Sequence, residues 1–433
     1  MKKYYIYTFG CKVNQYESQL VSEKFKNDKF EHAQKPEEAD IIVFNSCTVT
    51  AKADKECEYF LRKTAKLPNK PKIILTGCIV KNKNICVKTL LPDTDIEIIT
   101  DKTKLFIEPQ KQIVSSFDKH SRAFLKIQDG CNNFCSYCIV PYIRSISWSK
   151  SEKEVLSEIE NLVKRGYCEI VITGINLGKY NDRLLKTGLS GLIEKIIKIP
   201  LDFRIRVSSI ELNAVDNKLI EAIKENPEKI CCHLHIPLQS GSDKILKQMN
   251  RKYSAKEFEK KINKMVEVLP DLALTTDVIT GFPNETKKNH KATCNFIKRL
   301  PFTRLHIFRY SDRQGTKAST FKNKVCANEI KNRSQELSKI DFEKRKIFLK
   351  KYIGTKRKAV KVGEYKALTD NYIKVELQQA ENKNTTNCSA SKCLNKTLLN
   401  KTRYIANAVY SPHSPLSLKN GIFEVEITET AKI

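Results

Sequence analysis

A long apolar run and an internal repeat are both missing from this sequence of 433 residues. No segment approaches the roughly 18 apolar residues that a membrane-spanning helix needs, so we expect a cytoplasmic protein that makes no contact with a membrane. Residues 4–9 follow two lysines and are apolar, but the stretch is shorter than the roughly 7 to 15 residues of a secretion-signal core. We predict a first β-strand there instead.

Acidic residues are in short supply. Asp and Glu number 49 against 78 Lys and Arg, which gives a formal net charge of +29. Such an excess attracts polyanions, so RNA or DNA is the first candidate partner. The alternative source of part of the excess is a genome whose base composition favours lysine codons.

Cysteine is plentiful, but the 15 cysteines are an odd number in a chain too long for a small disulfide scaffold. In a reducing cytosol, such cysteines are metal ligands, catalytic groups or small buried residues. We therefore treat the cysteines by their position in the predicted fold.

The length suggests about three domains, and an α/β fold class follows from the alternation of strands and helices. In residues 1–115, strands at 4–8, 41–44, 73–75 and 96–99 alternate with helices at 14–25, 48–65 and 86–90. This pattern predicts a doubly wound parallel sheet. In residues 117–350, six strand–helix units predict a partial (β/α)6 barrel, two units short of a closed one. The strands are predicted at 123–128, 169–173, 203–208, 233–236, 272–279 and 304–308.

The C-terminal part begins with a predicted amphipathic helix at 327–352. Its expected apolar side consists of Ile330, Leu337, Ile340, Ile347 and Phe348. Residues 351–433 contain strand-like runs at 358–362, 372–377, 405–409 and 421–427, which predict a small β-barrel of the kind often used on nucleic acid. Between 378 and 401 the composition turns to Asn, Lys, Thr and Ser, so we expect a divergent, disordered insertion there.

Three cysteines share one place in the first predicted sheet. Cys11, Cys47 and Cys78 each follow one of its first three strands. Because the carboxyl ends of the strands form the ligand crevice of an open α/β sheet, the three thiols predict a three-ligand metal site. Cys57 and Cys86 fall inside helical patterns, and we expect them in the core.

A second triad is compact. Residues 129–138 read DGCNNFCSYC, so Cys131, Cys135 and Cys138 are spaced Cys-x3-Cys-x2-Cys on the loop after the first barrel strand. Three such thiolates can hold three irons of a [4Fe–4S] cluster and leave the fourth iron open to a small molecule. A structural zinc site is the alternative, but it needs four ligands, and the loop offers no fourth Cys or His.

The second triad, with Tyr137 before its last cysteine, resembles the radical S-adenosylmethionine (SAM) superfamily. Within it, the sequence resembles the methylthiotransferases along nearly the whole chain. The first matching segments are GCKVNQYES at 10–18, NSCTV at 45–49 and TGC at 76–78. Three further matching segments are HLHIPLQSGS at 233–242, TDVITGFPNE at 276–285 and YSDRQGT at 310–316. LTDNYIKV at 368–375 resembles the RNA-binding TRAM domain.

This resemblance implies two [4Fe–4S] clusters, one on each cysteine triad, and SAM as cosubstrate. SAM at the second triad yields a radical that removes hydrogen from carbon 2 of an adenine. The cluster on the first triad supplies or carries sulfur, which a second SAM methylates. A tRNA anticodon stem-loop is the implied partner, and a flavodoxin or ferredoxin is the implied reductant.

The residues after Cys11, KVNQ, resemble the branch that acts on N6-threonylcarbamoyladenosine beside the anticodon. Enzymes for isopentenyladenosine tRNA usually have Gln-Met-Asn there, and those for a ribosomal protein have Pro-Lys-Asn. Both remain alternative substrates. A non-enzymatic RNA-binding protein with redox-sensing clusters is a further alternative, although such clusters normally have four cysteine ligands.

Further SAM contacts are expected at the ends of the barrel strands, where loops carry the chemistry. Turns or ordinary packing are the competing interpretation for each. We assign the expected contacts to Tyr137, Gly174, Asn176, Ser208, Glu211, Gln239 and Gly281. His233 and His235 suggest a metal site, but alternation onto a buried strand face explains them better.

The sequence departs from the family after the second triad. Residues 144–150 read RSISWSK where the family has Arg-Gly-Pro-x-Arg-Ser-Arg, so Trp148 and Lys150 replace two arginines. Leu212 stands where proline is usual. These changes put local RNA or cofactor contacts in doubt.

Overall fold

The computed structural model describes residues 1–82, 96–108, 112–117, 121–379, 404–410 and 421–432. The helix expected at 86–90, with Cys86, and most of the insertion expected at 378–401 lie outside these residues. Within them, no helix has both the length and the apolar composition to cross a membrane. The α/β fold class with parallel sheets is confirmed.

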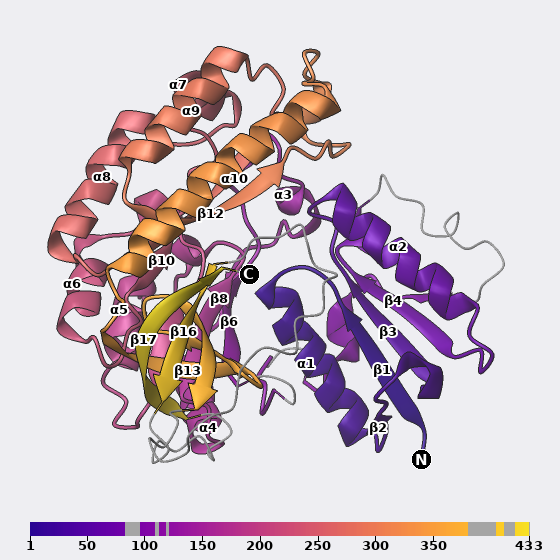
Figure 1. The fold of residues 1–433 in the computed structure, drawn as a ribbon. Helices are drawn as coiled ribbons and strands as arrows, with labels where there is room; N and C mark the ends of the chain where they lie inside the picture. The colour runs from indigo at the N-terminus through magenta and orange to yellow at the C-terminus, as the bar shows by residue number, and fades with distance from the viewer. Residues whose placement is uncertain (83–95, 109–111, 118–120, 380–403, 411–420, 433) are drawn as a thin grey trace, which may run out of the picture.

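The first sheet is parallel, with strand order β2-β1-β3-β4-β5 (Figure 1). Its strands are β1 (Lys3–Thr8), β2 (Glu31–His32), β3 (Ile41–Ser46), β4 (Lys72–Gly77) and β5 (Ile96–Ile98). Helix α1 (Lys12–Asn27) packs between this sheet and the barrel, and α2 (Ala51–Ala65) covers the opposite face. Tyr16, Leu20 and Val21 of α1 therefore join the core of the barrel. Cys57 of α2 is buried in a separate core, as expected.

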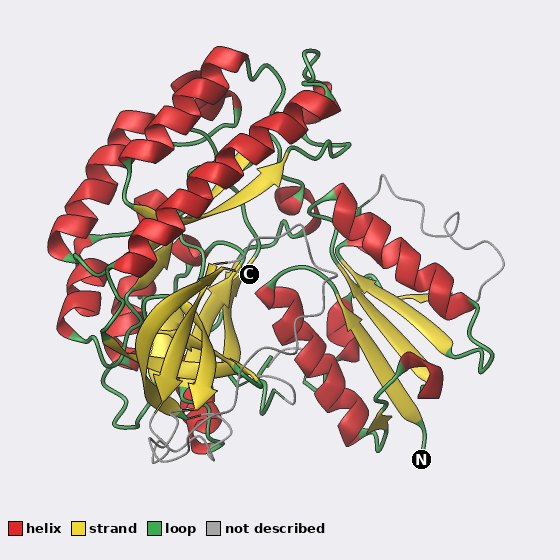
Figure 2. Cartoon of the chain, viewed as in Figure 1, coloured by secondary structure: helices red, strands yellow, loops and turns green. Residues whose placement is uncertain are grey.

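The barrel has six parallel strands in chain order. Helices lie on its outer face (Figure 2). The strands are β6 (Ala123–Asp129), β8 (Glu169–Gly174), β9 (Arg204–Val207), β10 (His233–His235), β11 (Ala273–Thr280) and β12 (Phe302–Arg309). Isolated bridges join β9 to β10. The short strand β7 (Trp148–Ser149) pairs antiparallel with β6, and no pairing of β6 with β12 closes the described barrel. The open side can admit a large substrate.

Helices cover the outside of this barrel because their apolar stripes face the strands. They are α4 (Glu152–Lys164), α5 (Leu189–Ile196), α6 (Asn217–Glu225), α7 (Asp243–Gln248), α8 (Ala255–Val268) and α9 (Lys287–Arg299). Ser151 and Ser254 begin α4 and α8 with capping boxes, each satisfying orphan amides of the first turn. The short α3 (Val140–Ile143) follows the second cysteine triad.

The long helix α10 (Ala327–Lys350) leads to a closed five-stranded barrel. The strands are β13 (Lys356–Gly363), β14 (Lys366–Thr369), β15 (Lys374–Gln379), β16 (Tyr404–Tyr410) and β17 (Ile422–Lys432). Two expectations change here. Strand β14 was missed, because its pairing with β13 and β15 is not visible in so short a run. Ile347 is 61% exposed, since the helical period buries Leu349 in its place.

The C-terminal barrel docks against charged residues that line the inside of the larger barrel. Arg204 and Arg206 donate to backbone carbonyls at residues 358 and 368–370, and both form ion pairs with the buried Glu169. Tyr372 stacks on His233 with ring centroids 4.0 Å apart. The turn after β14 therefore forms the floor of the larger barrel.

Candidate active site

The first cysteine triad lies at one edge of the N-terminal sheet. Cys11, Cys47 and Cys78 follow β1, β3 and β4, which are neighbouring parallel strands. Ser46 pairs with Gly77 in register, so Cys47 and Cys78 leave the sheet at the same level. Cys11 is also the N-cap residue of α1, where the positive end of the helix dipole favours a negatively charged ligand set.

Two glycines let the three cysteine segments approach one another. A Cβ at Gly10 would lie 2.6 Å from Sγ of Cys47, and one at Gly77 would lie 2.5 Å from the backbone of Ser46. Both glycines have positive φ, at 89° and 100°. Any larger residue would force Cys11 and Cys47 apart, so the spacing of this triad depends on Gly10.

We expect Gly10→Ala to reduce the iron bound by the first triad while the second triad keeps its own. Gly166→Ala is the matched control, because Gly166 has a similar φ of 91° but nothing lies within 4 Å of an added Cβ. Both variants carry the same backbone strain, and only Gly10→Ala crowds a thiol. Iron and sulfide analysis after reconstitution distinguishes them. Equal iron in the two variants would contradict the packing argument.

The second triad sits on the loop after β6, and two distant segments fix this loop. The amide of Cys131 donates to the carbonyl of Arg144 at 3.2 Å, and the amide of Ser136 donates to the carbonyl of Met249 at 3.0 Å. The side chain of Asn250 donates to the carbonyl of Phe134 at 2.9 Å. Phe134 has a φ of 47°, a strained conformation that these contacts hold.

Two side chains donate hydrogen bonds to these thiols. Nδ2 of Asn176 lies 3.6 Å from Sγ of Cys131, and Nη1 of Arg251 lies 3.3 Å from Sγ of Cys135. Arg251 is itself held by a bidentate ion pair with Glu211. Donors of this kind stabilise thiolate sulfur and tune the potential of a cluster. Arg251 was not predicted, because it lies more than a hundred residues from the triad along the chain.

Segments of the two triads meet at the interface of sheet and barrel. Cys78 packs against Ile139, which is the residue after Cys138, and against Ile143, which is the last residue of α3. An ionic network lies beside this contact. Arg144 bonds Glu17 of α1 at 2.8 and 2.9 Å and Asp129 of β6 at 2.8 and 2.9 Å.

Glu17 is the centre of this network and is buried. It also pairs with Lys102 at 2.5 Å and with Lys126 at 3.0 Å. The surrounding cations outweigh its desolvation, which by itself would raise the pKa, and they hold the pKa of Glu17 well below its usual value. The network joins helix α1 to residues of the barrel and so stabilises the docking of the N-terminal domain on the barrel.

Among the described residues, the three sulfurs of neither triad all lie within 4.8 Å of one another. Burial raises the pKa of Cys47 and of Cys138 to about 12, so these thiols are neutral until a metal displaces their protons.

A cavity of about 250 Å³ opens beside the second triad. Asn176 and Glu211, both expected SAM contacts, line it together with Cys135, Arg251 and Lys179. The expected contact Tyr137 does not line this cavity and packs in an apolar cluster with Met249 and Phe282.

The other expected contacts have local structural roles. Gly174 packs against Gln128, where a Cβ would lie 3.1 Å from its carbonyl oxygen. Gly281 faces Ile330 of α10, which a Cβ would meet at 2.2 Å. Ser208 is buried and bonds Thr173 at 3.5 Å, and Gln239 bridges to β11 through its backbone. None of these four lines the cavity beside the second triad.

Comparison with known proteins places the chain in a family. Residues 125–297 match the Radical SAM superfamily, and residues 3–98 match a family described as uncharacterized protein family UPF0004. The threonylcarbamoyladenosine tRNA methylthiotransferase MtaB of Thermotoga maritima is 36% identical over 379 residues, covering 83% of this chain and 86% of that protein. MtaB of Bacillus subtilis is 34% identical over 408 residues, covering 87% and 90%. This chain belongs to the radical SAM methylthiotransferase family.

The resemblance inferred from the sequence is therefore confirmed, and the protein is a methylthiotransferase that uses SAM and a [4Fe–4S] cluster. A tRNA-2-methylthio-N(6)-dimethylallyladenosine synthase of Caldicellulosiruptor saccharolyticus is 34% identical over 368 residues, covering 78% of each chain. Family membership alone thus leaves two tRNA nucleosides to be distinguished.

The methylthiotransferase departs from its family at positions that the structure explains. Lys150 is buried, pairs with Glu158 and lies 3.0 Å from the hydroxyl of Tyr16. The ammonium of Lys126 lies over the ring of Trp148, 5.0 Å from the ring centroid. Lys150 therefore stabilises the interface of sheet and barrel, because Tyr16 belongs to α1.

Proposed function

We propose that the protein is a tRNA N6-threonylcarbamoyladenosine methylthiotransferase that acts at carbon 2 of adenosine 37, beside the anticodon. The observation that carries this proposal is the contact of Cys78, in the first cysteine triad, with Ile139, the residue after the second triad. Relatives named MtaB at 31–37% identity supply the nucleoside. The division into a methylthiotransferase domain (1–115), a radical SAM core (117–350) and a TRAM domain (351–433) is part of the proposal.

In this proposal Cys131, Cys135 and Cys138 hold the cluster that binds SAM, and Cys11, Cys47 and Cys78 hold a second [4Fe–4S] cluster. The clusters and SAM supply the radical, the sulfur and the methyl group. The protein positions them: Arg251 and Asn176 orient the thiolates, and the Glu17 network keeps the two sites together. Asn176 and Glu211 are the SAM contacts that the cavity supports.

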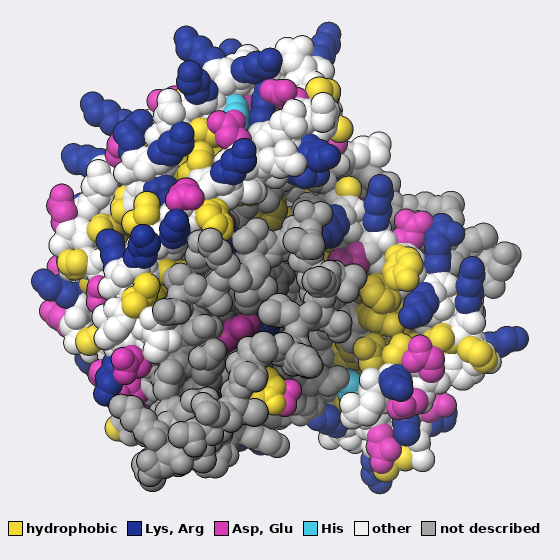
Figure 3. Space-filling model, viewed as in Figure 1, with side chains coloured by type: hydrophobic (Ala, Val, Ile, Leu, Met, Phe, Trp, Pro, Cys, Tyr) yellow, Lys and Arg dark blue, Asp and Glu magenta, His cyan; other side chains and the backbone are white. Residues whose placement is uncertain are grey.

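The RNA partner is the anticodon stem-loop, whose unpaired adenosine can enter the open side of the barrel without melting a duplex. Residues 338–358, from α10 into β13, carry nine Lys and Arg against two acidic residues. A cavity at the same seam is lined by Arg304, Arg345, Lys366 and Lys374. Figure 3 shows Lys and Arg side chains spread along α10 and the neighbouring helices. A cytoplasmic flavodoxin or ferredoxin is the proposed reductant.

The test compares two anticodon stem-loops, one with threonylcarbamoyladenosine and one with isopentenyladenosine, under reconstituted enzyme, SAM and reductant. We expect methylthiolation of the first by nucleoside mass analysis and little of the second. Modification of the isopentenyl RNA alone would assign the protein to the other branch. Failure to cleave SAM after reduction would favour a redox-sensing RNA-binding protein.

A further inference from the structure

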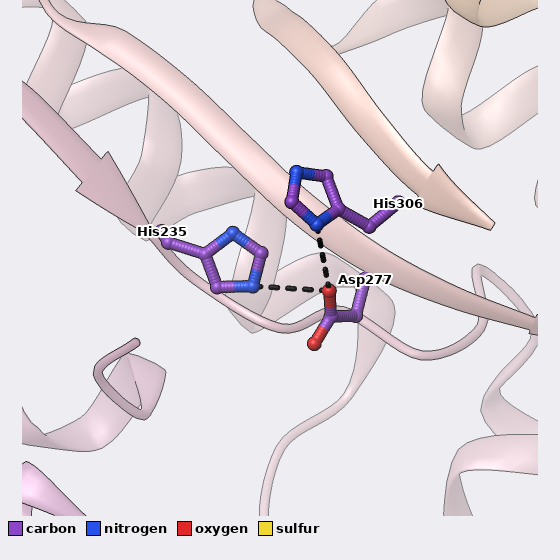
Figure 4. A group of neighbouring side chains, drawn as sticks. All are labelled: His235, Asp277 and His306. Carbon is purple, nitrogen blue, oxygen red and sulfur yellow. Dashed lines mark ion pairs between the residues drawn. The ribbon is translucent and has the colours of Figure 1, made fainter. Parts of the chain in front are cut away.

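Three polar side chains meet inside the barrel. His235, Asp277 and His306 come from the neighbouring strands β10, β11 and β12 and point toward one another (Figure 4). Nε2 of His235 lies 3.1 Å from Oδ1 of Asp277, and Nδ1 of His306 lies 3.9 Å from the same oxygen. His235 does lie on a buried strand face, as predicted, and that face lines the interior of the barrel.

Hydrogen bonds fix this group and leave one atom open. The hydroxyl of Thr275 bonds Nδ1 of His235 at 2.8 Å, so the other ring nitrogen faces Asp277. Nε2 of His306 is buried and has no hydrogen-bond partner among the described residues. An unpaired buried ring nitrogen costs free energy, which a bound ligand would recover.

Two cations beside the group are also unpaired. Lys12 is the first residue of α1 and follows Cys11 directly, and Arg304 lies two residues before His306 on the same face of β12. No described residue accepts a hydrogen bond from either side chain or forms an ion pair with it. Burial lowers the pKa of both His233 and His306, and the charge of Lys12 adds to this effect.

The charges below the group have the same sign. Arg122, Arg204 and Arg206 share the single carboxylate of Glu169. His235, Asp277 and His306 offer the ligand types of a divalent-metal site, with their ligand atoms within 4.8 Å. The surplus of fixed positive charge disfavours a dication there and favours an anion.

We infer that Lys12, Arg304 and His306 form a subsite for a carboxylate, and that this carboxylate is the one on the threonyl part of the modified adenosine. The inference rests on the proposed function and deepens it. A threonylcarbamoyl group carries a carboxylate and a hydroxyl, whereas an isopentenyl group is apolar and would leave the subsite unpaired. Because Lys12 adjoins Cys11, a group bound there lies next to the first cysteine triad.

The first experiment changes the RNA and leaves the protein intact. Anticodon stem-loops carry threonylcarbamoyladenosine, its methyl ester, or isopentenyladenosine, and we measure both the dissociation constant and the methylthiolation rate. A hydrogen-bonded charge contributes about 1.5–3 kcal/mol, so the ester should bind about 10- to 100-fold more weakly than the acid. Equal binding and equal rates for acid and ester would overturn the subsite while the proposed function stands.

The second experiment locates the charge on the protein. Lys12→Gln and Arg304→Gln should each weaken binding of the acid and leave binding of the ester unchanged, so the preference for the acid collapses. Lys24→Gln is the matched control, since Lys24 lies on the same helix in an exposed ion pair with Asp28. Iron content is measured in each variant, because Lys12 adjoins a cluster ligand. An unchanged preference in both variants would overturn the assignment, and methylthiolation of the isopentenyl RNA alone would overturn the proposed function and the subsite with it.

Discussion

Replacing Cys131, Cys135 and Cys138 together with alanine should lower the iron of anaerobically reconstituted protein from about eight atoms per chain to about four. The triads lie on separate segments, the first at the ends of three strands of the N-terminal sheet and the second on a single barrel loop. Each should therefore assemble its own cluster. The remaining iron should support no SAM cleavage, because the proposed SAM-binding cluster belongs to the lost triad.

The reciprocal variant has Cys11, Cys47 and Cys78 replaced with alanine. It should also hold about four irons per chain, but it should still cleave SAM and fail only at methylthiolation. Cys168→Ala is the control, because Cys168 is half-buried and lies in neither triad, so its iron and activity should match the unaltered protein. About four irons in the unaltered protein, all lost with the second triad, would contradict a second cluster. The enzyme would then need another source of sulfur.

Much of the fold could be predicted because local pattern and long-range structure agree. The strand cores at 4–8, 41–44 and 73–75 appear as β1, β3 and β4, and the six barrel strands follow in the expected order. Parallel strands that are buried on both faces are short apolar runs in the sequence, and turn residues mark where each run ends. The position of each cysteine after a strand then follows from the fold itself.

The partners of buried charges could not be predicted. Arg144 pairs with Glu17, which lies more than a hundred residues earlier in the chain. Lys12 served only to identify a branch of the family, and its place beside His306 depends on how the sheet docks against the barrel. Such pairings arise when separate elements pack together, so they cannot be predicted from the spacing of residues along the chain.

Arg144→Ala should loosen the docking of the N-terminal sheet on the barrel more than any other single change in the network. Removing one partner of a buried ion pair typically costs about 3–5 kcal/mol, because the remaining charge is left uncompensated. Here Glu17 would keep Lys102 and Lys126, whereas Asp129 would keep only Lys126. We expect a lower midpoint of thermal unfolding and a variant that retains both clusters but couples SAM cleavage poorly to methylthiolation.

Arg62→Ala is the control, since the Arg62–Glu58 pair is exposed and should contribute at most about 1 kcal/mol.

The pH dependence adds a second criterion. The pKa of Glu17 is lowered in the folded protein, so its contribution is complete above the pKa of an unfolded glutamate, about 4.3, and is lost as the pH falls through the folded value. The destabilisation by Arg144→Ala should therefore be constant between about pH 6 and 8. A destabilisation no larger than that of Arg62→Ala would mean that apolar contacts such as Cys78 with Ile139 hold the two triads together without the network.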